Sequence, residues 1–537
     1  MGFSGMHQAA WVPHIEEYVK KGFWRQYSLG EELALLADKH EERLAVVSRE
    51  RRVSYRELDT MAEELANGFL KLGIRPGDRV LVQLPNTLEF IASAFAFFKF
   101  GALPIFTMPT SRESDVGALC ALAEPTAYLG TGSFQGFDYN PLVKKTASGN
   151  PSIRYVISDD GSLADSISLA ELRSTDKVPY STPDFRGPAM LLISGGTTGT
   201  PKLIPRRHAD YAYNARAAAL RCGLGEDSAY LVVLPAAHNF SLSSPGILGT
   251  LSAGGRVVFS ESSACDEAFA LIEKERITIT ALVPALLNLW LEAVEWEEAD
   301  ISSLRLIQVG GSPLPSAVAL NVEPKLGCKL QQVFGTAEGL ICQTAPDDPA
   351  EVVLYTQGRP ISEADELRFV DAHGNDVPPG EEGELIVRGP YTIQGYYRAP
   401  EVNKTAVTAD GYYRTGDSAR ILPDGNIQVT GRIKDQINRS GEKLAPIEIE
   451  NHLRKHGDIQ DAAIVGIPDE LLGERTCAWI IAESRDIDLP SIHAFLTAQG
   501  LPRHKLPDQL EKIDAWPLTS VGKVNKRELV LLARRQK

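Results

Sequence analysis

The sequence predicts an α/β protein with a large N-terminal domain and a smaller α+β C-terminal domain. At 537 residues the chain is too long for a single hydrophobic core, so at least two domains are expected. Helical and strand patterns alternate through the N-terminal part, as they do in βαβ units with parallel sheets. From about Val352 the pattern changes to short strands separated by turns, which indicates a small barrel.

The first predicted elements form an alternating series. Ser54 and Glu57 match a capping box, and apolar residues then recur at helical spacing until Gly73. A glycine is a typical helix end because it adopts the left-handed backbone conformation easily. The series continues with a strand at 79–84, a helix at 89–100 and a strand at 103–106.

The same alternation returns further along the chain and then gives way to short strands. The domain boundary is placed at Lys434, in a charged stretch, which gives domains at residues 1–433 and 434–537. The later predicted elements are strands at 230–234, 256–259 and 277–283, a helix at 268–276, and short strands at 384–387 and 425–429.

Composition excludes several classes of protein. The net charge of −15 argues against a nucleic-acid partner, whose phosphates would be repelled. The longest apolar stretch, at residues 90–106, is interrupted by Lys99, Gly101 and Pro104, so no membrane span is expected. The six cysteines are widely spaced and form no C-x-x-C pair, which favours free thiols in a reducing compartment. We therefore expect a cytoplasmic protein.

An apolar run at residues 189–193 is followed by a polar loop, called the phosphate loop below. Glycines let backbone N–H groups approach an anion, hydroxyls supply further donors, and Lys202 adds positive charge. The loop therefore predicts binding of a nucleotide triphosphate, although the Walker A pattern is absent. It consists of Ser194, Gly195, Gly196, Thr197, Thr198, Gly199, Thr200, Pro201 and Lys202.

Five further motifs follow the phosphate loop, at residues 332–339, 413–417, 431–435, 441–443 and 517–523. Together these motifs resemble the ordered core motifs of the adenylate-forming superfamily, which includes acyl-CoA synthetases, nonribosomal-peptide adenylation domains and firefly luciferases. The resemblance spans essentially the whole chain. It implies an N-terminal domain of two α/β subdomains plus a small distorted β-barrel, followed by a mobile C-terminal domain with its hinge at Lys434.

The implied reaction joins a carboxylate oxygen to the α-phosphorus of ATP, so positive charge must offset the repulsion of two anions. By resemblance, Glu338 binds Mg²⁺, Asp417 holds the ribose hydroxyls and Arg432 is its basic neighbour. Lys523 serves adenylation, and Lys443 faces the site during thioester formation. The other implied residues are His238 in catalysis and, around the nucleotide, Gly311, Val333, Phe334, Gly335 and Thr336.

Residues 235–246 bear on which acid is activated. Amino-acid-activating relatives have an Asp at the position of Asn239, and a neutral amide suits a phenolic hydroxyl better than an ammonium. The segment resembles the stand-alone aryl-acid ligases of siderophore biosynthesis. In that subgroup Ser at the position of Ser244 is typical of 2,3-dihydroxybenzoate ligases, and Cys of salicylate ligases. The implied aryl-acid residues are Asn239, Phe240, Ser244, Gly310, Ser312, Val333 and Ile341.

Two of these residues depart from the pattern of the 2,3-dihydroxybenzoate ligases. Ser312 stands where Ala is common, and Ile341 stands where Val is frequent. An extra hydroxyl and an extra methylene should make the pocket narrower and more polar. Since a methylene in an apolar pocket changes selectivity by roughly 1–3 kcal/mol, the tolerated ring substituents stay open.

The sequence thus predicts a ligase that uses ATP and Mg²⁺ to convert 2,3-dihydroxybenzoate to its adenylate, with release of pyrophosphate. The resemblance implies that the aryl group then passes to the phosphopantetheine thiol of an aryl carrier protein. A salicylate- or benzoate-AMP ligase and an aryl-CoA ligase are the alternatives.

Overall fold

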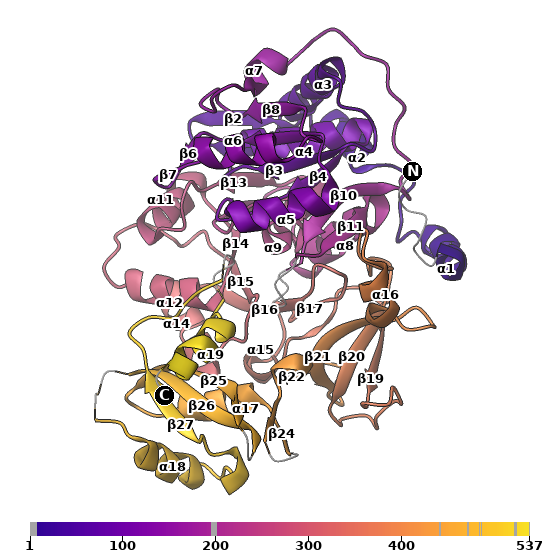
Figure 1. Ribbon diagram of the computed structural model, residues 1–537. Helices are drawn as coiled ribbons and strands as arrows, with labels where there is room; N and C mark the ends of the chain where they lie inside the picture. Colours follow the sequence, from indigo (N-terminus) through magenta and orange to yellow (C-terminus); the bar gives the residue numbers. More distant parts are fainter. Residues whose placement is uncertain are drawn as a thin grey trace.

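The computed structural model describes residues 8–194, 201–439, 442–469, 472–482, 484, 486–519 and 523–535. Two large, mainly parallel sheets form the N-terminal part, and two smaller sheets follow them along the chain (Figure 1). The predicted α/β class is therefore confirmed. None of the helices that the structure describes has the length and apolar character that a membrane span requires.

The seven-stranded sheet carries the phosphate loop at one edge. Neighbouring strands in this sheet run parallel, except that the edge strand β11 is antiparallel to β10. In spatial order its strands are β11 (Leu203–Arg207), β10 (Pro188–Ile193), β4 (Leu103–Phe106), β3 (Arg79–Gln83), β5 (Ala127–Gly130), β8 (Tyr155–Ser158) and β9 (Ile167–Ser168).

The nine-stranded sheet is parallel in its centre and antiparallel at both edges. Its carboxyl edge supplies most of the site described below. In spatial order its strands are β18 (Arg359–Pro360), β17 (Ile341–Gln343), β16 (Lys329–Gly335), β15 (Leu306–Gly310), β14 (Ile279–Leu282), β12 (Ala229–Val232), β13 (Arg256–Phe259), β1 (Leu44–Ser48) and β2 (Arg51–Ser54).

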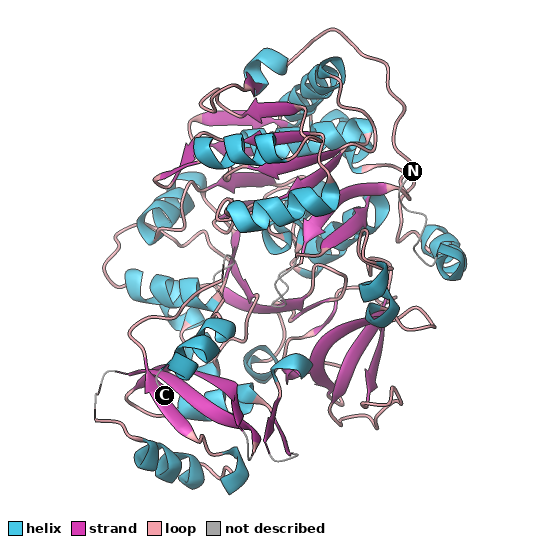
Figure 2. Ribbon diagram, in the orientation of Figure 1, coloured by secondary structure: helices cyan, strands magenta, loops and turns pink. Residues whose placement is uncertain are grey.

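Helices lie between the two sheets and on both outer faces, and Figure 2 distinguishes them from the strands by colour. Successive strand residues face opposite sides, so Val80 and Val82 pack into the central core whereas Leu81 packs outward. The central core also contains Val232 and Val257 of the nine-stranded sheet. This shared core joins the two sheets. The central helices are α2 (Leu29–His40), α3 (Tyr55–Leu72), α4 (Leu88–Phe100), α8 (His208–Arg221) and α10 (Gly246–Ser252), and the outer ones include α5 (Glu113–Ala123), α6 (Asn140–Gly149), α11 (Cys265–Glu275), α12 (Pro284–Ala293) and α14 (Val322–Leu326).

Local sequence signals determine where these helices begin and end. The Ser54 hydroxyl accepts from the Glu57 N–H, and the Glu57 carboxylate accepts from the Ser54 N–H, which confirms the predicted capping box of α3. The helix ends at Gly73, whose φ of 110° lies in the left-handed region. Five of the six cysteines are buried and all six are free, as the composition predicted.

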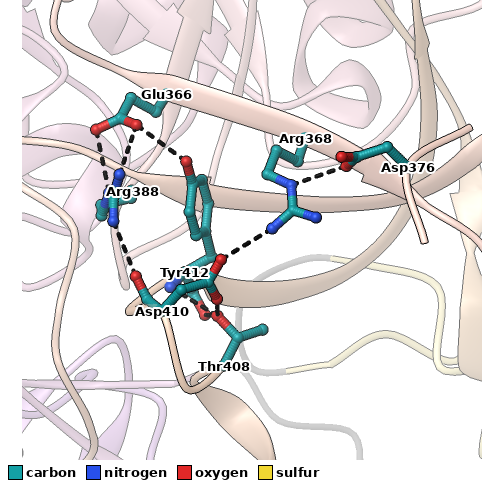
Figure 3. Close-up of polar contacts among 7 residues, drawn as sticks. All are labelled: Glu366, Arg368, Asp376, Arg388, Thr408, Asp410 and Tyr412. Carbon is teal, nitrogen blue, oxygen red and sulfur yellow. Dashed lines mark hydrogen bonds and ion pairs between the residues drawn. The ribbon is translucent and has the colours of Figure 1, made fainter. Parts of the chain in front are cut away.

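The region predicted to form a small barrel is an open four-stranded antiparallel sheet, β19 (Glu366–Val370), β20 (Gly383–Arg388), β21 (Tyr413–Ile421) and β22 (Ile427–Arg432). Figure 3 shows the ion network on it. Arg388 binds Glu366 at 2.7 Å and Arg368 binds Asp410 at 2.9 Å. The Tyr412 hydroxyl donates to Glu366 at 2.9 Å. Since Tyr412 directly precedes β21, the network anchors the start of that strand.

The C-terminal part is a five-stranded sheet with helices, which confirms the predicted α+β module. The predicted boundary at Lys434 lies in a short 3₁₀ helix, η1 (Ile433–Asp435), between the last strand of the four-stranded sheet and the first strand of this one. Its elements are β23 (Ile437–Arg439), β24 (Glu442–Leu444), α17 (Pro446–Leu453), β25 (Ile459–Asp469), β26 (Gly473–Ala482), α18 (Leu489–Ala498), η2 (Arg503–Lys505), β27 (Gln509–Lys512) and α19 (Lys526–Arg535).

The remaining elements are short or peripheral. They are α1 (Gln8–Lys20), β6 (Ser133–Phe134), β7 (Phe137–Asp138), α7 (Leu169–Leu172), α9 (Asn239–Ser243), α13 (Ser316–Ala319), α15 (Ala350–Tyr355) and α16 (Pro400–Ala406).

We expect two glycines in helices to respond oppositely to substitution by alanine. A Cβ on Gly68 in α3 would lie 1.9 Å from the Leu172 carbonyl oxygen, whereas a Cβ on Gly117 in α5 would meet nothing within 4 Å. Gly68→Ala should therefore lower the free energy of unfolding by roughly 1–3 kcal/mol. Gly117→Ala should raise it by up to about 1 kcal/mol, since alanine favours the helix. Thermal melting followed by circular dichroism measures both, and equal shifts in melting temperature would contradict the close approach of α3 and α7.

Candidate active site

The predicted site residues gather at the carboxyl edge of the nine-stranded sheet. Gly310 ends β15 and Gly335 ends β16. Strand β12 leads through a turn to α9, which begins directly after His238. Carboxyl ends of parallel strands meet at one edge of a sheet, where open α/β folds bind their ligands. The contacts below bring the phosphate loop and β21 to the same edge.

The phosphate loop connects β10 to β11, and its residues 195–200 lie outside the described residues. The Ser194 N–H donates to the Lys202 carbonyl at 2.9 Å, which closes the base of the loop. The Ser194 hydroxyl is buried and has no hydrogen-bond partner among the described residues. The Lys202 ammonium lies over the Tyr396 ring, 4.4 Å from its centroid.

Glu338 is buried and held by Tyr396, a residue that the sequence patterns did not reveal. The Tyr396 hydroxyl donates to Glu338 Oε1 at 2.8 Å and lies 3.0 Å from the Tyr413 hydroxyl. The Ile393 N–H donates to the Glu338 carbonyl at 2.7 Å. Asn403 fixes the backbone of Tyr396, since it accepts from its N–H at 2.7 Å and donates to its carbonyl at 3.0 Å. The carboxylate of Glu338 therefore has a defined position.

Arg206 is a second residue that the sequence patterns missed. Its side chain is fully buried and pairs with Asp210 at 3.0 Å. It also donates to the carbonyl of Ala337 at 2.8 Å and to the carbonyl of Tyr391 at 3.0 Å. It thereby joins the strand after the phosphate loop to the residue beside Glu338. The i,i+4 spacing from Asp210 is the one signal in the sequence that could have indicated it.

Asp417 and Arg432 form a cross-strand pair between β21 and β22. The distance from Arg432 Nε to Asp417 Oδ1 is 2.6 Å, and Asp417 is only 2% exposed. Burial raises the pKa of Asp417 to about 6, and the nearby Arg432 charge partly opposes this rise. The second carboxylate oxygen, Oδ2, has no partner within the described part of the chain.

Lys523 reaches this edge from the C-terminal part. A Cβ built on Gly311, whose φ is 87°, would lie 3.7 Å from Lys523 Cε. Burial lowers the pKa of Lys523, and the Arg432 charge lowers it further, whereas Asp417 and Glu338 attract the ammonium and oppose the shift. The structure therefore brings Lys523 into the electrostatic field of the predicted nucleotide residues.

His238 is neutral in this site. Burial, and then the charge of Lys523, lower its pKa to about 4. The Phe240 N–H donates to His238 Nδ1 at 3.1 Å. Since Nδ1 accepts, the proton of the neutral ring must lie on Nε2, which makes Nε2 a donor.

The two residues predicted to select the acid, Asn239 and Ser244, are held from behind. The hydroxyl of Tyr211, a third residue missed by the sequence patterns, donates to Asn239 Oδ1 at 2.9 Å. Ser244 is buried, and its carbonyl accepts from Gln343 Nε2 at 3.3 Å. The side chain of Asn239 and the backbone of Ser244 are thus each held by a neighbouring side chain.

The strand ends pack tightly around these residues. A Cβ on Gly310 would lie 2.6 Å from the Val333 carbonyl oxygen and 3.3 Å from the Phe240 ring, so only glycine allows this approach. Ile341 is buried and lies opposite Gly335 in the register of β16 and β17. Four of the predicted aryl-acid residues therefore share one packed region.

The other predicted residues differ in exposure. Thr336 is buried, Phe334 is half-buried and Ser312 is exposed. Lys434 lies in η1, where burial and then the Arg432 charge lower its pKa. Lys443 lies in β24, but its side chain is outside the part that the structure describes.

The arrangement fits a nucleotide bound with a divalent metal. Ser194 Oγ, Thr336 Oγ1 and Asp417 Oδ2 are buried polar atoms without partners among the described residues, and such atoms are costly unless a ligand meets them. Over the described ranges, no cluster of three or more His, Cys, Asp or Glu side chains could hold a metal. Mg²⁺ bound beside phosphates needs only one or two protein carboxylates, a role that Glu338 alone can fill.

Comparison with known proteins agrees with this geometry. The AMP-binding enzyme model matches residues 34–397, and the AMP-binding enzyme C-terminal domain model matches residues 448–523. The chain is 47% identical over 516 residues to the 2,3-dihydroxybenzoate-AMP ligase of Bacillus subtilis, covering 96% of this chain and 95% of the relative. It is 45% identical over 520 residues to the salicyl-AMP ligase / salicyl-S-ArCP synthetase of Mycobacterium tuberculosis, covering 96% and 92%.

Among solved structures, the apo structure of Mycobacterium smegmatis MbtA matches with a TM-score of 0.76 and 42% identity, covering 99% of this chain and 98% of that chain. The family match spans more than half of the chain, and the geometry gathers the same motifs at one edge of the sheet. The chain therefore belongs to the family of AMP-binding enzymes, the adenylate-forming superfamily that its motifs resemble.

Proposed function

We propose that the enzyme activates 2,3-dihydroxybenzoate with ATP and Mg²⁺, forming the aryl-adenylate and releasing pyrophosphate. The observation that carries the proposal is the position of Lys523 against Gly311, in the field of Asp417 and Glu338. The two relatives named above, both aryl-acid AMP ligases by name, support adenylation of an aryl acid, and the Bacillus subtilis relative supports 2,3-dihydroxybenzoate as that acid.

In the proposed reaction a carboxylate oxygen of the acid bonds to the α-phosphorus of ATP while the bond from that phosphorus to pyrophosphate breaks. The Lys523 ammonium offsets the negative charge where the two anions meet. His238 donates from Nε2 to an oxygen of the incoming acid. Lys202 and the phosphate loop hold the departing pyrophosphate. Glu338 would hold Mg²⁺, which supplies further positive charge at the phosphates when bound.

Asp417 and Arg432 serve the nucleoside in this proposal. The unpartnered Oδ2 of Asp417 accepts from the ribose hydroxyls, while Oδ1 stays paired with Arg432. The pairing keeps the buried carboxylate charged, which a good acceptor must be.

The choice of acid rests on Asn239 and Ser244. Asn239 is neutral, so it does not favour the ammonium of an amino acid, and Ser244 offers a hydroxyl to the 3-hydroxyl of the ring. The buried Ile341 narrows the pocket. Salicylate is the second candidate, because a relative of similar identity is named a salicyl-AMP ligase.

Transfer of the aryl group to the phosphopantetheine thiol of an aryl carrier protein is the proposed second step. The thiol attacks the aryl carbonyl, and AMP leaves. We propose that residues 434–537 turn about Lys434 so that Lys443 replaces Lys523 at the site. The name of the Mycobacterium tuberculosis relative, which includes salicyl-S-ArCP synthetase, supports a carrier rather than coenzyme A as acceptor.

Lys523→Ala should abolish acid-dependent ATP–pyrophosphate exchange, with a loss in kcat of about 100-fold or more, because it removes charge stabilisation of the transition state. Transfer from supplied aryl-adenylate should stay intact. Lys455→Ala, which removes an exposed lysine of the same part of the chain, is the control. Exchange near the wild-type rate in Lys523→Ala would show that the assigned role is wrong.

Ser244→Cys should shift preference from 2,3-dihydroxybenzoate toward salicylate by about five- to tenfold, since a thiol is a weaker hydrogen-bond partner for the 3-hydroxyl. The ratio of kcat/KM for the two acids in the exchange assay measures the shift. Ser93→Cys, at another fully buried serine in α4, controls for the larger sulfur atom. An unchanged ratio would remove Ser244 from the specificity argument.

Nucleotide affinity should fall as the pH drops through about 6. Because the pKa of Asp417 is raised from 3.8 to about 6, its charged form is lost at a higher pH than that of an ordinary carboxylate. The Kd for a non-cleavable ATP analogue, measured by calorimetry from pH 5 to 8, should therefore rise at the acid end. Asp417→Asn should bind the analogue more weakly. Because this variant lacks the carboxylate, its pH profile shows the part of the change that comes from titration of the analogue's phosphates. Parallel profiles for the two proteins would contradict the role of Asp417.

A further inference from the structure

A chain of buried hydrogen bonds beneath the site fixes the orientation of Asn239. Tyr211 is completely buried, and its hydroxyl donates to Asn239 Oδ1 at 2.9 Å. Since the amide oxygen faces Tyr211, the amide nitrogen points to the other side. That nitrogen donates to no group among the described residues, and Asn239 is half-exposed. Asn239 therefore offers N–H to a ligand.

At the far end of this series of hydrogen bonds, a backbone carbonyl determines which group is the donor. Asn214 Nδ2 donates to the Ser243 carbonyl at 2.5 Å and to Ser243 Oγ at 2.9 Å. A carbonyl only accepts, so the amide of Asn214 cannot be turned round. Since Ser243 Oγ receives this hydrogen bond, its own proton is available for the next group.

Tyr211 is that next group. Burial raises the pKa of the Tyr211 phenol, and a hydrogen bond from Ser243 opposes the rise. The phenol directs its own proton to Asn239 Oδ1, an amide oxygen that only accepts. The donors of Asn214 and Tyr211 thus have fixed acceptors, and Asn239 presents its own N–H group at the site.

We infer that Tyr211 is a positioning residue that locks Asn239 as a donor and thereby selects acids with a hydrogen-bond acceptor in the ortho position. The inference rests on the proposed function. In a 2-hydroxybenzoate the hydroxyl gives its proton to the neighbouring carboxylate, so its oxygen is free to accept from Asn239. A 2-amino group of nearly the same size presents N–H instead and leaves two donors facing each other.

Two acids that differ only in the ortho group test this inference: 2,3-dihydroxybenzoate and 2-amino-3-hydroxybenzoate. Tyr211→Phe frees the Asn239 amide to rotate and accept from an amine. The ratio of kcat/KM for the two acids in pyrophosphate exchange should therefore fall about tenfold or more. The kcat/KM for 3-hydroxybenzoate, which lacks an ortho group, should change by no more than about twofold.

Ser243→Ala leaves the bond between Tyr211 and Asn239 possible but removes a hydroxyl that interacts with the Tyr211 phenol, so it should lower the ratio of kcat/KM by a smaller factor. This variant keeps the test available if Tyr211→Phe does not fold. Tyr139→Phe removes another buried tyrosine hydroxyl, which donates to the Pro109 carbonyl at 2.6 Å, and should leave the ratio unchanged. Melting temperatures confirm that each variant is folded.

The outcomes separate this inference from the proposed function. An unchanged ratio in both variants, or an equal loss for all three acids, would overturn the role of Tyr211 while the ligase activity stands. If the wild-type enzyme activates none of the three acids, the proposed function itself fails. A rise in kcat/KM for 2-amino-3-hydroxybenzoate alone in Tyr211→Phe supports both the role of Tyr211 and the proposed function.

Discussion

The buried guanidinium of Arg206 is the interaction on which the geometry of the site depends. It pairs with Asp210 and donates to two carbonyls, one beside Glu338 and one in the segment that leads to Tyr396. Without the guanidinium, these acceptors would be buried and unsatisfied, at a cost far above that of an exposed ion pair. Arg206 therefore fixes the position of β11, the strand after the phosphate loop, relative to Glu338, the proposed metal ligand. The remaining contacts refine this arrangement.

The charges at the site are balanced across two parts of the chain. Burial raises the pKa of Asp417 and lowers the pKa of Lys523, and the attraction between the two charges opposes both shifts. A low-dielectric site strengthens such attractions, so the C-terminal part stabilises the charged form of the site when Lys523 is present. Withdrawal of Lys523 leaves Asp417 with Arg432 as its cationic partner. The proposed alternation of the two parts would thus change the balance of charge around Asp417.

The proposed recognition of the acid depends on groups that the acid would not touch. Asn239 and Ser244 are the residues proposed to meet the acid. Tyr211 bonds the side chain of Asn239, and Gln343 bonds the backbone carbonyl of Ser244. An amide can offer either of its two ends to a ligand, and the surrounding hydrogen bonds decide which end it offers. In this proposal, specificity depends on the direction of buried hydrogen bonds as well as on the identity of the lining residues.

The sequence determined the α/β class, the capping box of α3, the helix end at Gly73 and the ordered motifs that identify the family. Each of these signals is local, because capping, turn formation and motif spacing depend on neighbours in the chain. The tertiary structure alone decided that the predicted barrel is an open sheet. It alone brought Arg206, Tyr211 and Tyr396 to the site, since each of them bonds a group at or beside the site that lies 28 to 185 positions away along the chain. Contacts over such distances arise only when strands from separate segments align their carboxyl ends, and no local pattern records that alignment.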